Sequence, residues 1–183
     1  MSRSDEELAR GVQQGKNGDL IRLVEQHYDA LVGYLYRLNG GDRMLSEDMV
    51  QETFLRVLRG IGGYDYPRPF KPWLYAIATN LARNHFKRAD TRYAVAADDE
   101  VLVDVPEHDP PPEEILMLDD DMRDLAAALR VLPDHQRETI ILRYCQELSL
   151  VEIAEVLAVP VGTVKSRLNL GLKRLREAME EPS

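Results

Sequence analysis

Toward its C-terminal end the chain reads Ser149-Leu-Val-Glu-Ile-Ala-Glu-Val-Leu157, Ala158-Val-Pro160 and Val161-Gly-Thr-Val-Lys-Ser-Arg-Leu168. Ser149, followed three residues later by Glu152, forms a capping box, which predicts that a short helix begins there. The three-residue turn leads into a longer run with apolar residues at helical spacing, which predicts a second helix. A short helix, a tight turn and a helix that opens with small and polar residues have the spacing of a helix-turn-helix.

The second helix of this motif indicates an interface with duplex DNA. Its apolar residues recur every three or four positions and are expected to hold it to a core: Val164, Leu168, Leu172, Leu175 and Met179. Residues 160–176 include five cations and no acid, an excess that a bare helical hairpin does not require. The outer face combines hydroxyl, amide and cationic groups, which can reach base edges in a major groove: Thr163, Ser166, Arg167, Asn169 and Lys173.

An acidic segment, residues 94–121, precedes this region. It holds 11 acids, four prolines and no Lys or Arg. Such a segment buries too little apolar surface to offset its ordering entropy, and its charges repel one another, so we expect an extended, flexible linker. Three roles stay open for it: a solvated spacer, an anionic strand in a basic channel of a partner, or a shield over the chain's own basic faces.

The overall charge hides this uneven distribution. The 183-residue chain has a net charge of −9 and a pI near 5.0, which taken alone argues against nucleic-acid binding. However, residues 1–93 carry 14 basic and 12 acidic side chains, and residues 122–183 carry nine of each. The sequence therefore predicts an all-α protein with two small helical domains, 1–93 and 122–183, joined by the acidic linker 94–121, the second domain being the helix-turn-helix.

Within the first domain, polar residues predict where helices begin: Ser4, Asp19 and Ser46. The helix after Ser46 has an inward row of Val50, Phe54, Val57 and Ile61. Its outward row has an apolar residue among charged and polar ones, which suits either a solvated face or a docking surface: Asp48, Gln51, Glu52, Leu55 and Arg56.

A turn-rich loop, residues 60–70, and a helix over about 71–88 complete the first domain. One face of that helix carries an amide–guanidinium–amide–ammonium row: Asn80, Arg83, Asn84 and Lys87. Cations neutralise phosphates, amides reach base edges, and nearby rings can stack on an unpaired base. The candidate stacking rings are Tyr64, Tyr66 and Trp73.

Three stretches resemble bacterial RNA polymerase sigma factors of the extracytoplasmic-function (ECF) type. Ser46-Glu-Asp-Met-Val-Gln-Glu-Thr-Phe-Leu-Arg56 resembles the helix that binds the polymerase clamp. Phe70-Lys-Pro-Trp-Leu-Tyr-Ala-Ile-Ala-Thr-Asn-Leu-Ala-Arg-Asn84 resembles the segment that melts and reads the minus-ten element. Val159-Pro-Val-Gly-Thr-Val-Lys-Ser-Arg167, with Leu132-Pro133, resembles the region that reads the minus-thirty-five element. The likeness covers roughly residues 19–93 and 122–179.

The resemblance implies an alternative sigma factor that binds core RNA polymerase and promoter DNA, with three sets of contacts. The clamp would be bound by Asp48, Gln51, Glu52, Leu55 and Arg56. A flipped-out base would enter the loop that carries Tyr64, Tyr66 and Phe70, beside Trp73, and the melted strand would be held by Asn80, Arg83, Asn84, Lys87 and Arg88. The upstream duplex would be met by Thr163, Lys165, Ser166, Arg167, Asn169 and Lys173. The family usually has Gly where this chain has Ala158, a change that costs about 1 kcal/mol if the backbone there is left-handed.

Other function classes fit the residues less well. The four histidines are scattered, without the spacing of metal ligands or a nucleophile–base set, so we expect no enzyme, metal or cofactor. No stretch is long enough to span a membrane, and the N-terminus is unlike a secretory signal, so we expect a cytoplasmic protein. Two alternatives stay open, a free-standing helix-turn-helix regulator and a sigma-mimicking interaction protein. Whether an anti-sigma protein binds the chain also stays open.

Overall fold

The computed structural model describes residues 3–96 and 120–180. Every regular element in these ranges is helical, as the sequence predicts. In chain order the elements are α1 Asp5–Gln13, α2 Asn17–Leu38, α3 Arg43–Gly60, η1 Ile61–Gly63, α4 Phe70–Ala96, α6 Asp120–Leu129, α7 Asp134–Ile140, η2 Ile141–Cys145, α8 Leu150–Leu157 and α9 Val161–Glu180. Residues 97–119, which make up most of the predicted acidic linker, lie outside the described residues.

The first group of helices, α1 to α4, is built around α2. This helix packs against α1, α3 and α4, and its apolar stripe of Leu23, Leu31 and Leu35 is fully buried. The inward row predicted for α3 is also buried, from Val50 to Ile61. The 3.6-residue period thus places one face of each helix in a shared core and leaves the polar faces outside.

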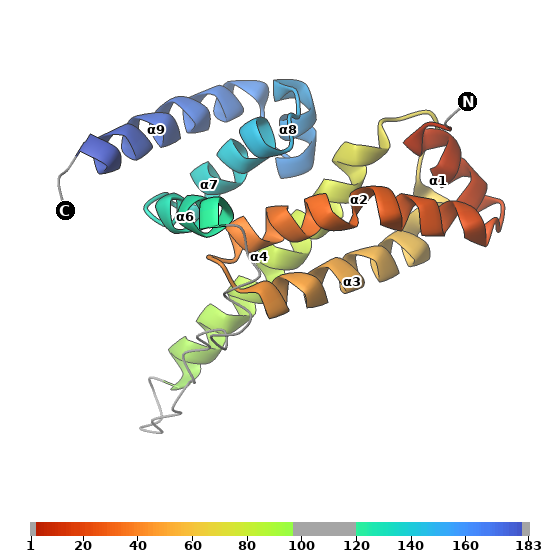
Figure 1. The fold of residues 1–183 in the computed structure, drawn as a ribbon, viewed down its shortest axis with the longest axis horizontal. Helices are drawn as coiled ribbons and strands as arrows, with labels where there is room; N and C mark the ends of the chain where they lie inside the picture. Colours follow the sequence, from red (N-terminus) through yellow and green to blue (C-terminus); the bar gives the residue numbers. More distant parts are fainter. Residues whose placement is uncertain (1–2, 97–119, 181–183) are drawn as a thin grey trace.

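The second group, α6 to α9, contains the predicted helix-turn-helix in α8 and α9. Ser149 and Glu152 form the expected capping box at the start of α8. Ala158 ends α8 in the left-handed conformation, with φ 53° and ψ 48°. Val164 and Leu168 hold α9 to the core, but the prediction that Met179 belongs to that row is wrong, because Met179 is 82% exposed. The end of α9 extends past the other helices of the second group (Figure 1).

Two predicted helix starts are corrected by the structure. The N-cap of α3 is Asp42, whose carboxylate accepts from Leu45 N at 2.9 Å, whereas Ser46 is buried one turn inside and donates to the Asp42 carbonyl. Asp19 lies within α2, where its carboxylate pairs with Arg3 at 2.5 Å. Both side chains have tertiary or intrahelical partners that local propensity does not reveal. The predicted cap at Ser4 is confirmed.

The two groups of helices pack directly against each other. Helix α2 contacts α6, α7 and η2, and α4 contacts α8, so that buried residues of both groups form one continuous core. Figure 1 shows the second group lying along one side of α2 and α4, while the far end of α4 extends beyond the other described helices. The sequence predicted two domains but not this shared interface. No helix within the described ranges is long and apolar enough to cross a membrane.

Candidate polymerase and nucleic-acid interfaces

The outward face of α3 is accessible as the sequence predicts. Asp48, Gln51 and Arg56 are exposed, and Leu55 is 48% exposed. Glu52 is half-buried and accepts a hydrogen bond from Arg56 Nε at 2.9 Å. An exposed leucine framed by charged residues gives a partner both an apolar contact and polar complementarity.

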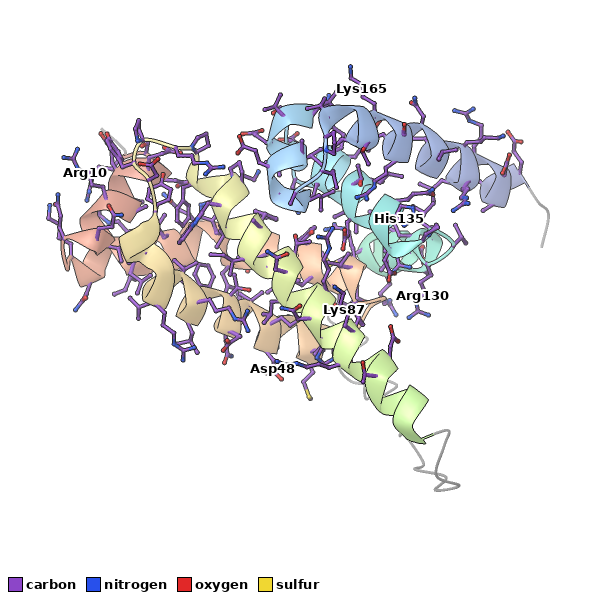
Figure 2. All side chains as sticks on the ribbon, turned by 180° about the vertical axis from the view of Figure 1, so that it is seen from behind. Arg10, Asp48, Lys87, Arg130, His135 and Lys165 are labelled. Carbon is purple, nitrogen blue, oxygen red and sulfur yellow. The ribbon has the colours of Figure 1, made fainter. Side chains whose placement is uncertain are left out.

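This α3 face shares a groove with α4. The groove has a volume of about 340 Å³, and its α3 wall includes Asp48, Glu52 and Arg56, while its α4 wall includes Asn84 and Arg88. The sequence treated these two sets as separate surfaces, one for a protein partner and one for DNA. The structure brings their edges together, so that a partner seated on α3 lies next to the cationic side of α4. Figure 2 shows Asp48 at one edge of the molecule and Lys87 on α4 nearby.

The rings of the loop before α4 divide into buried and accessible ones. Tyr64 is 4% exposed and Phe70 is fully buried, and both pack against Trp73 with ring centroids 5.3 and 5.7 Å away. Tyr64 and Phe70 therefore support the loop from beneath and their rings are enclosed in this arrangement, while their part in DNA binding stays a prediction. Tyr66, at 38% exposed, and the half-buried Trp73 are the rings that a base can reach.

Most of the predicted DNA-binding face of α4 is exposed, with one exception. Asn80, Asn84, Lys87 and Arg88 are open to solvent. Arg83 instead turns toward α7, where its guanidinium donates to both carboxylate oxygens of Glu138 at 2.9 and 2.6 Å.

This pair of Arg83 and Glu138 is largely enclosed. Glu138 is 4% exposed, and its hydrogen bonds raise the pKa of the Arg83 guanidinium. The second group of helices covers this part of α4. Arg83, which the sequence predicts to bind DNA, is therefore already bonded to the Glu138 carboxylate.

A second set of polar contacts crosses the same interface. The Tyr75 hydroxyl donates to Gln146 Oε1 and Lys71 Nζ donates to the Gln146 carbonyl, both at 2.6 Å. Sequence reasoning missed Glu138 and Gln146, because their partners lie 55 or more positions away and no local spacing links them.

The outer face of α9 is accessible in the arrangement described. Lys165, Ser166, Asn169 and Lys173 are exposed, while Thr163 and Arg167 are half-buried. Figure 2 shows Lys165 pointing outward at the edge of the molecule opposite to Asp48. The polar face of α9 and the α3 face therefore point in different directions, which allows each to meet a different partner.

The described residues hold no group of three or more His, Cys, Asp or Glu side chains arranged to bind a metal ion. His27 is buried, with its Nε2 2.8 Å from the Asp5 carboxylate and its ring beside Phe70. It serves the packing of α1 on α2.

Comparisons with known proteins agree with this geometry. Residues 23–92 match the family model for sigma-70 region 2, and residues 122–175 match that for sigma-70 region 4. The chain is 32% identical over 95% of its length to the ECF RNA polymerase sigma factor SigW of Bacillus subtilis, of which it covers 97%. It is 38% identical over 88% of its length to the ECF RNA polymerase sigma factor SigE of Mycolicibacterium smegmatis, and spans 62% of that protein.

A solved structure shares the fold over nearly the whole chain. The structure of CnrH in complex with the cytosolic domain of CnrY matches with a TM-score of 0.74 and 25% identity, covering 98% of this chain and 99% of that one. The match to region 2 also accounts for the first group of helices, which a free-standing helix-turn-helix regulator does not explain. The chain belongs to the ECF RNA polymerase sigma factors.

Proposed function

We propose that this sigma factor uses three separate surfaces during initiation: α3 to bind core RNA polymerase, the 60–70 loop with α4 to hold the melted minus-ten strand, and α9 to read the minus-thirty-five duplex. The observation that supports the proposal is that all three surfaces are exposed to solvent in the same molecule. The α3 face offers an exposed leucine among charges, and α4 and α9 offer exposed amides and cations. The surfaces belong to the proposed domains 1–93 and 122–183, with 94–121 as their linker.

On α4, the amides and cations are suited to a single strand. Asn80 and Asn84 lie one turn apart and can bond base edges, while Lys87 and Arg88 neutralise phosphates. Tyr66 offers a ring on which an unpaired base stacks, and such stacking helps to offset the few kcal/mol that unstacking a base from duplex DNA costs.

Engagement of the strand by Arg83 requires a change of partner. Its guanidinium donates to Glu138 from two nitrogens, and two oxygens of a phosphate can accept from the same two nitrogens in place of the carboxylate. We infer that DNA binding exchanges the Glu138 carboxylate for a phosphate, which separates α7 from α4 at this point.

On α9, the exposed side chains near its start are suited to a major groove. A recognition helix contacts base edges through its N-terminal residues. Lys165, Ser166 and Asn169 lie in that part of α9 and are exposed. Each cationic surface alone binds DNA weakly and with strong salt dependence, whereas polymerase holds both at high effective concentration. Because this polymerase works in the cytoplasm, we propose that the chain acts there as a DNA-binding regulator.

The test is reconstitution of the full chain with bacterial core RNA polymerase. We expect the chain to co-elute with the core enzyme and to direct transcription from a distinct set of start sites, mapped by sequencing transcript 5′ ends. Core enzyme alone, and core enzyme with its primary sigma factor, are the controls. Failure to co-elute, or start sites identical to those of the controls, contradicts the proposal.

A further inference from the structure

Helix α1 lies outside the residues that match either sigma-70 region. It is nevertheless fixed firmly to the first group of helices. Leu8, Ala9 and Val12 are buried against α2, and Asp5 bonds His27 at 2.8 Å. The helix is therefore a rigid part of this group rather than a loose N-terminal extension.

The opposite side of α1 faces the loop that is proposed to capture a base. Three of its side chains, Glu6, Arg10 and Gln13, are spaced by four and three residues and so form one stripe along the helix. Each of the three contacts a different part of the chain between η1 and α4.

Gln13 holds the beginning of the loop. Its side-chain amide nitrogen donates to the carbonyl oxygens of Ile61 at 2.8 Å and Tyr64 at 2.7 Å. Both hydrogens of the amide are thereby used, and two acceptors on one side fix its orientation. Gln13 itself is exposed, so its side chain contributes to the loop rather than to the core.

The other two side chains hold the end and the middle of the loop. The backbone N–H of Phe70, the first residue of α4, donates to Glu6 Oε1 at 3.1 Å. The Arg10 guanidinium lies 4.7 Å from the ring centroid of Tyr66, the exposed ring proposed to meet a base. The stripe thus contacts the loop at three successive points.

The buried rings of Tyr64 and Phe70 anchor the loop from beneath, but its glycine stretch has no such packing. At Gly62 and Gly63 no atom lies within 4 Å of the place where a Cβ would stand, so this part of the backbone borders open space. Ordering a flexible loop costs entropy. If the loop is already held in its binding conformation, base capture does not have to supply that cost.

From these contacts we infer that α1 is a positioning element for base capture, and that Gln13 is its principal positioning residue. The inference rests on the proposed function of the 60–70 loop. It assigns α1 a part in selecting the captured base, without direct contact with that base. The positioning acts through the two loop carbonyls that Gln13 binds.

The first arm of the test measures the loop itself in the free, full-length protein. Gln13→Ala removes both hydrogen bonds, and Gln13→Glu keeps the shape but places carboxylate oxygens opposite two carbonyls. We expect both variants to speed hydrogen exchange of the amides in residues 61–70, with Gln13→Glu the stronger, and to leave α2 unchanged. Gln14→Ala, at the next exposed residue, is the matched control and should exchange like the parent. Unchanged exchange in residues 61–70 overturns the inference whatever the loop's function is.

The second arm measures base selection by the holoenzyme. The probes are four fork-junction DNAs from a promoter that the parent holoenzyme opens, differing only at the flipped-out base. We expect Gln13→Ala to lower binding of the preferred probe by about tenfold, as the loss of two hydrogen bonds implies, and to reduce its preference over the other three bases. A merely structural loss lowers all four affinities together and leaves that preference unchanged, so an unchanged preference overturns the inference. If the parent opens no promoter, the proposed function fails, while the exchange arm still decides whether α1 holds the loop.

Discussion

At Ala158 the backbone adopts φ 53° and ψ 48°, a left-handed conformation in which a Cβ crowds the following carbonyl. The residue is exposed, so no side-chain packing compensates for that crowding. The helix-turn-helix requires this turn, because the left-handed residue reverses the chain between α8 and α9. The left-handed backbone on which the cost of an alanine here depends is therefore present.

A glycine at this position should relieve the crowding. We expect Ala158→Gly to raise the free energy of unfolding by about 1 kcal/mol, measured by urea denaturation. The matched control is Ala127→Gly on the exposed side of α6, which should lower the free energy by about 0.5–1 kcal/mol because glycine costs entropy inside a helix. Equal effects of the two substitutions would contradict the role of backbone conformation at Ala158.

The buried tyrosines predict an alkaline loss of stability. Burial is the main cause that raises the pKa of Tyr64 to about 12. A tyrosine in the unfolded chain loses its proton near pH 10. Between pH 10 and 12 the folded chain still holds the proton of Tyr64, so the ionisation stabilises the unfolded state alone. The contribution of Tyr64 is complete below about pH 10 and is lost as the pH rises toward 12.

We therefore expect the free energy of unfolding, measured in urea at pH 9, 10 and 11, to fall over this range. Tyr64→Phe has no hydroxyl to ionise, so its free energy should fall less steeply than that of the parent. The remaining slope should come from other buried rings, since burial also raises the pKa of Tyr34 and Tyr75. Identical slopes for parent and variant would show that Tyr64 ionises normally in the folded state.

At the scale of single helices, the faces of α3, α4 and α9 follow one rule. Each helix buries an apolar row in the core and thereby turns a defined polar row outward. The function of each face can therefore be tested by substitutions on the outside that leave the core intact.

On α3, we expect Leu55→Asp to weaken binding of core RNA polymerase at least tenfold, because the exposed leucine would be replaced by a charge that must be desolvated on docking. Ile21→Asp is the matched control, since Ile21 is 58% exposed on α2 and lies outside the proposed interface. Binding can be measured by fluorescence anisotropy with labelled protein. A similar loss from both substitutions would place the clamp contact elsewhere.

The proposed division of labour between α4 and α9 predicts two different defects. Asn80→Ala should impair promoter opening, seen as reduced permanganate reactivity of unpaired thymines, while upstream protection in a footprint is retained. Arg167→Ala should weaken upstream protection by about 1–3 kcal/mol of binding free energy, the range for one lost base contact. Normal opening with Asn80→Ala would refute the role given to α4.

At the scale of the whole molecule, the two groups of helices are held together by polar contacts of very different burial. Arg83 and Glu138 form a bidentate pair with Glu138 almost fully enclosed, whereas the pair of Arg68 and Glu155 is exposed on both sides at 3.4 Å. Ion pairs at a surface contribute little, but removing one partner of a pair that is largely enclosed is costly.

This contrast gives a matched pair of variants. Glu138→Gln removes one charge and should lower the free energy of unfolding by about 1–3 kcal/mol and increase the radius of gyration, measured by urea denaturation and small-angle X-ray scattering. Glu155→Gln, at the exposed pair, should lower it by less than about 1 kcal/mol and leave the radius unchanged. If both variants behave alike, the Arg83–Glu138 pair does not hold the two groups together.

The sequence by itself determined the features that depend on neighbours within one or two turns. The helical periods, the capping boxes at Ser4 and Ser149, the helix-turn-helix and the outward row of α3 all follow from residues three or four positions apart. The start of α3 was placed wrongly because the cap is Asp42, and Ser46 bonds inside the helix. The resemblance to a known family added the expected roles of these faces.

Only the tertiary structure decided which side chains are free to act. It enclosed Tyr64 and Phe70, paired Arg83 with Glu138 and set Gln13 against the loop before α4. Gln13 and Ile61 lie 48 positions apart in the sequence, and Arg83 and Glu138 lie 55 positions apart. The periodicity of a single helix does not predict such contacts, because they form only when several helices have buried their apolar faces together.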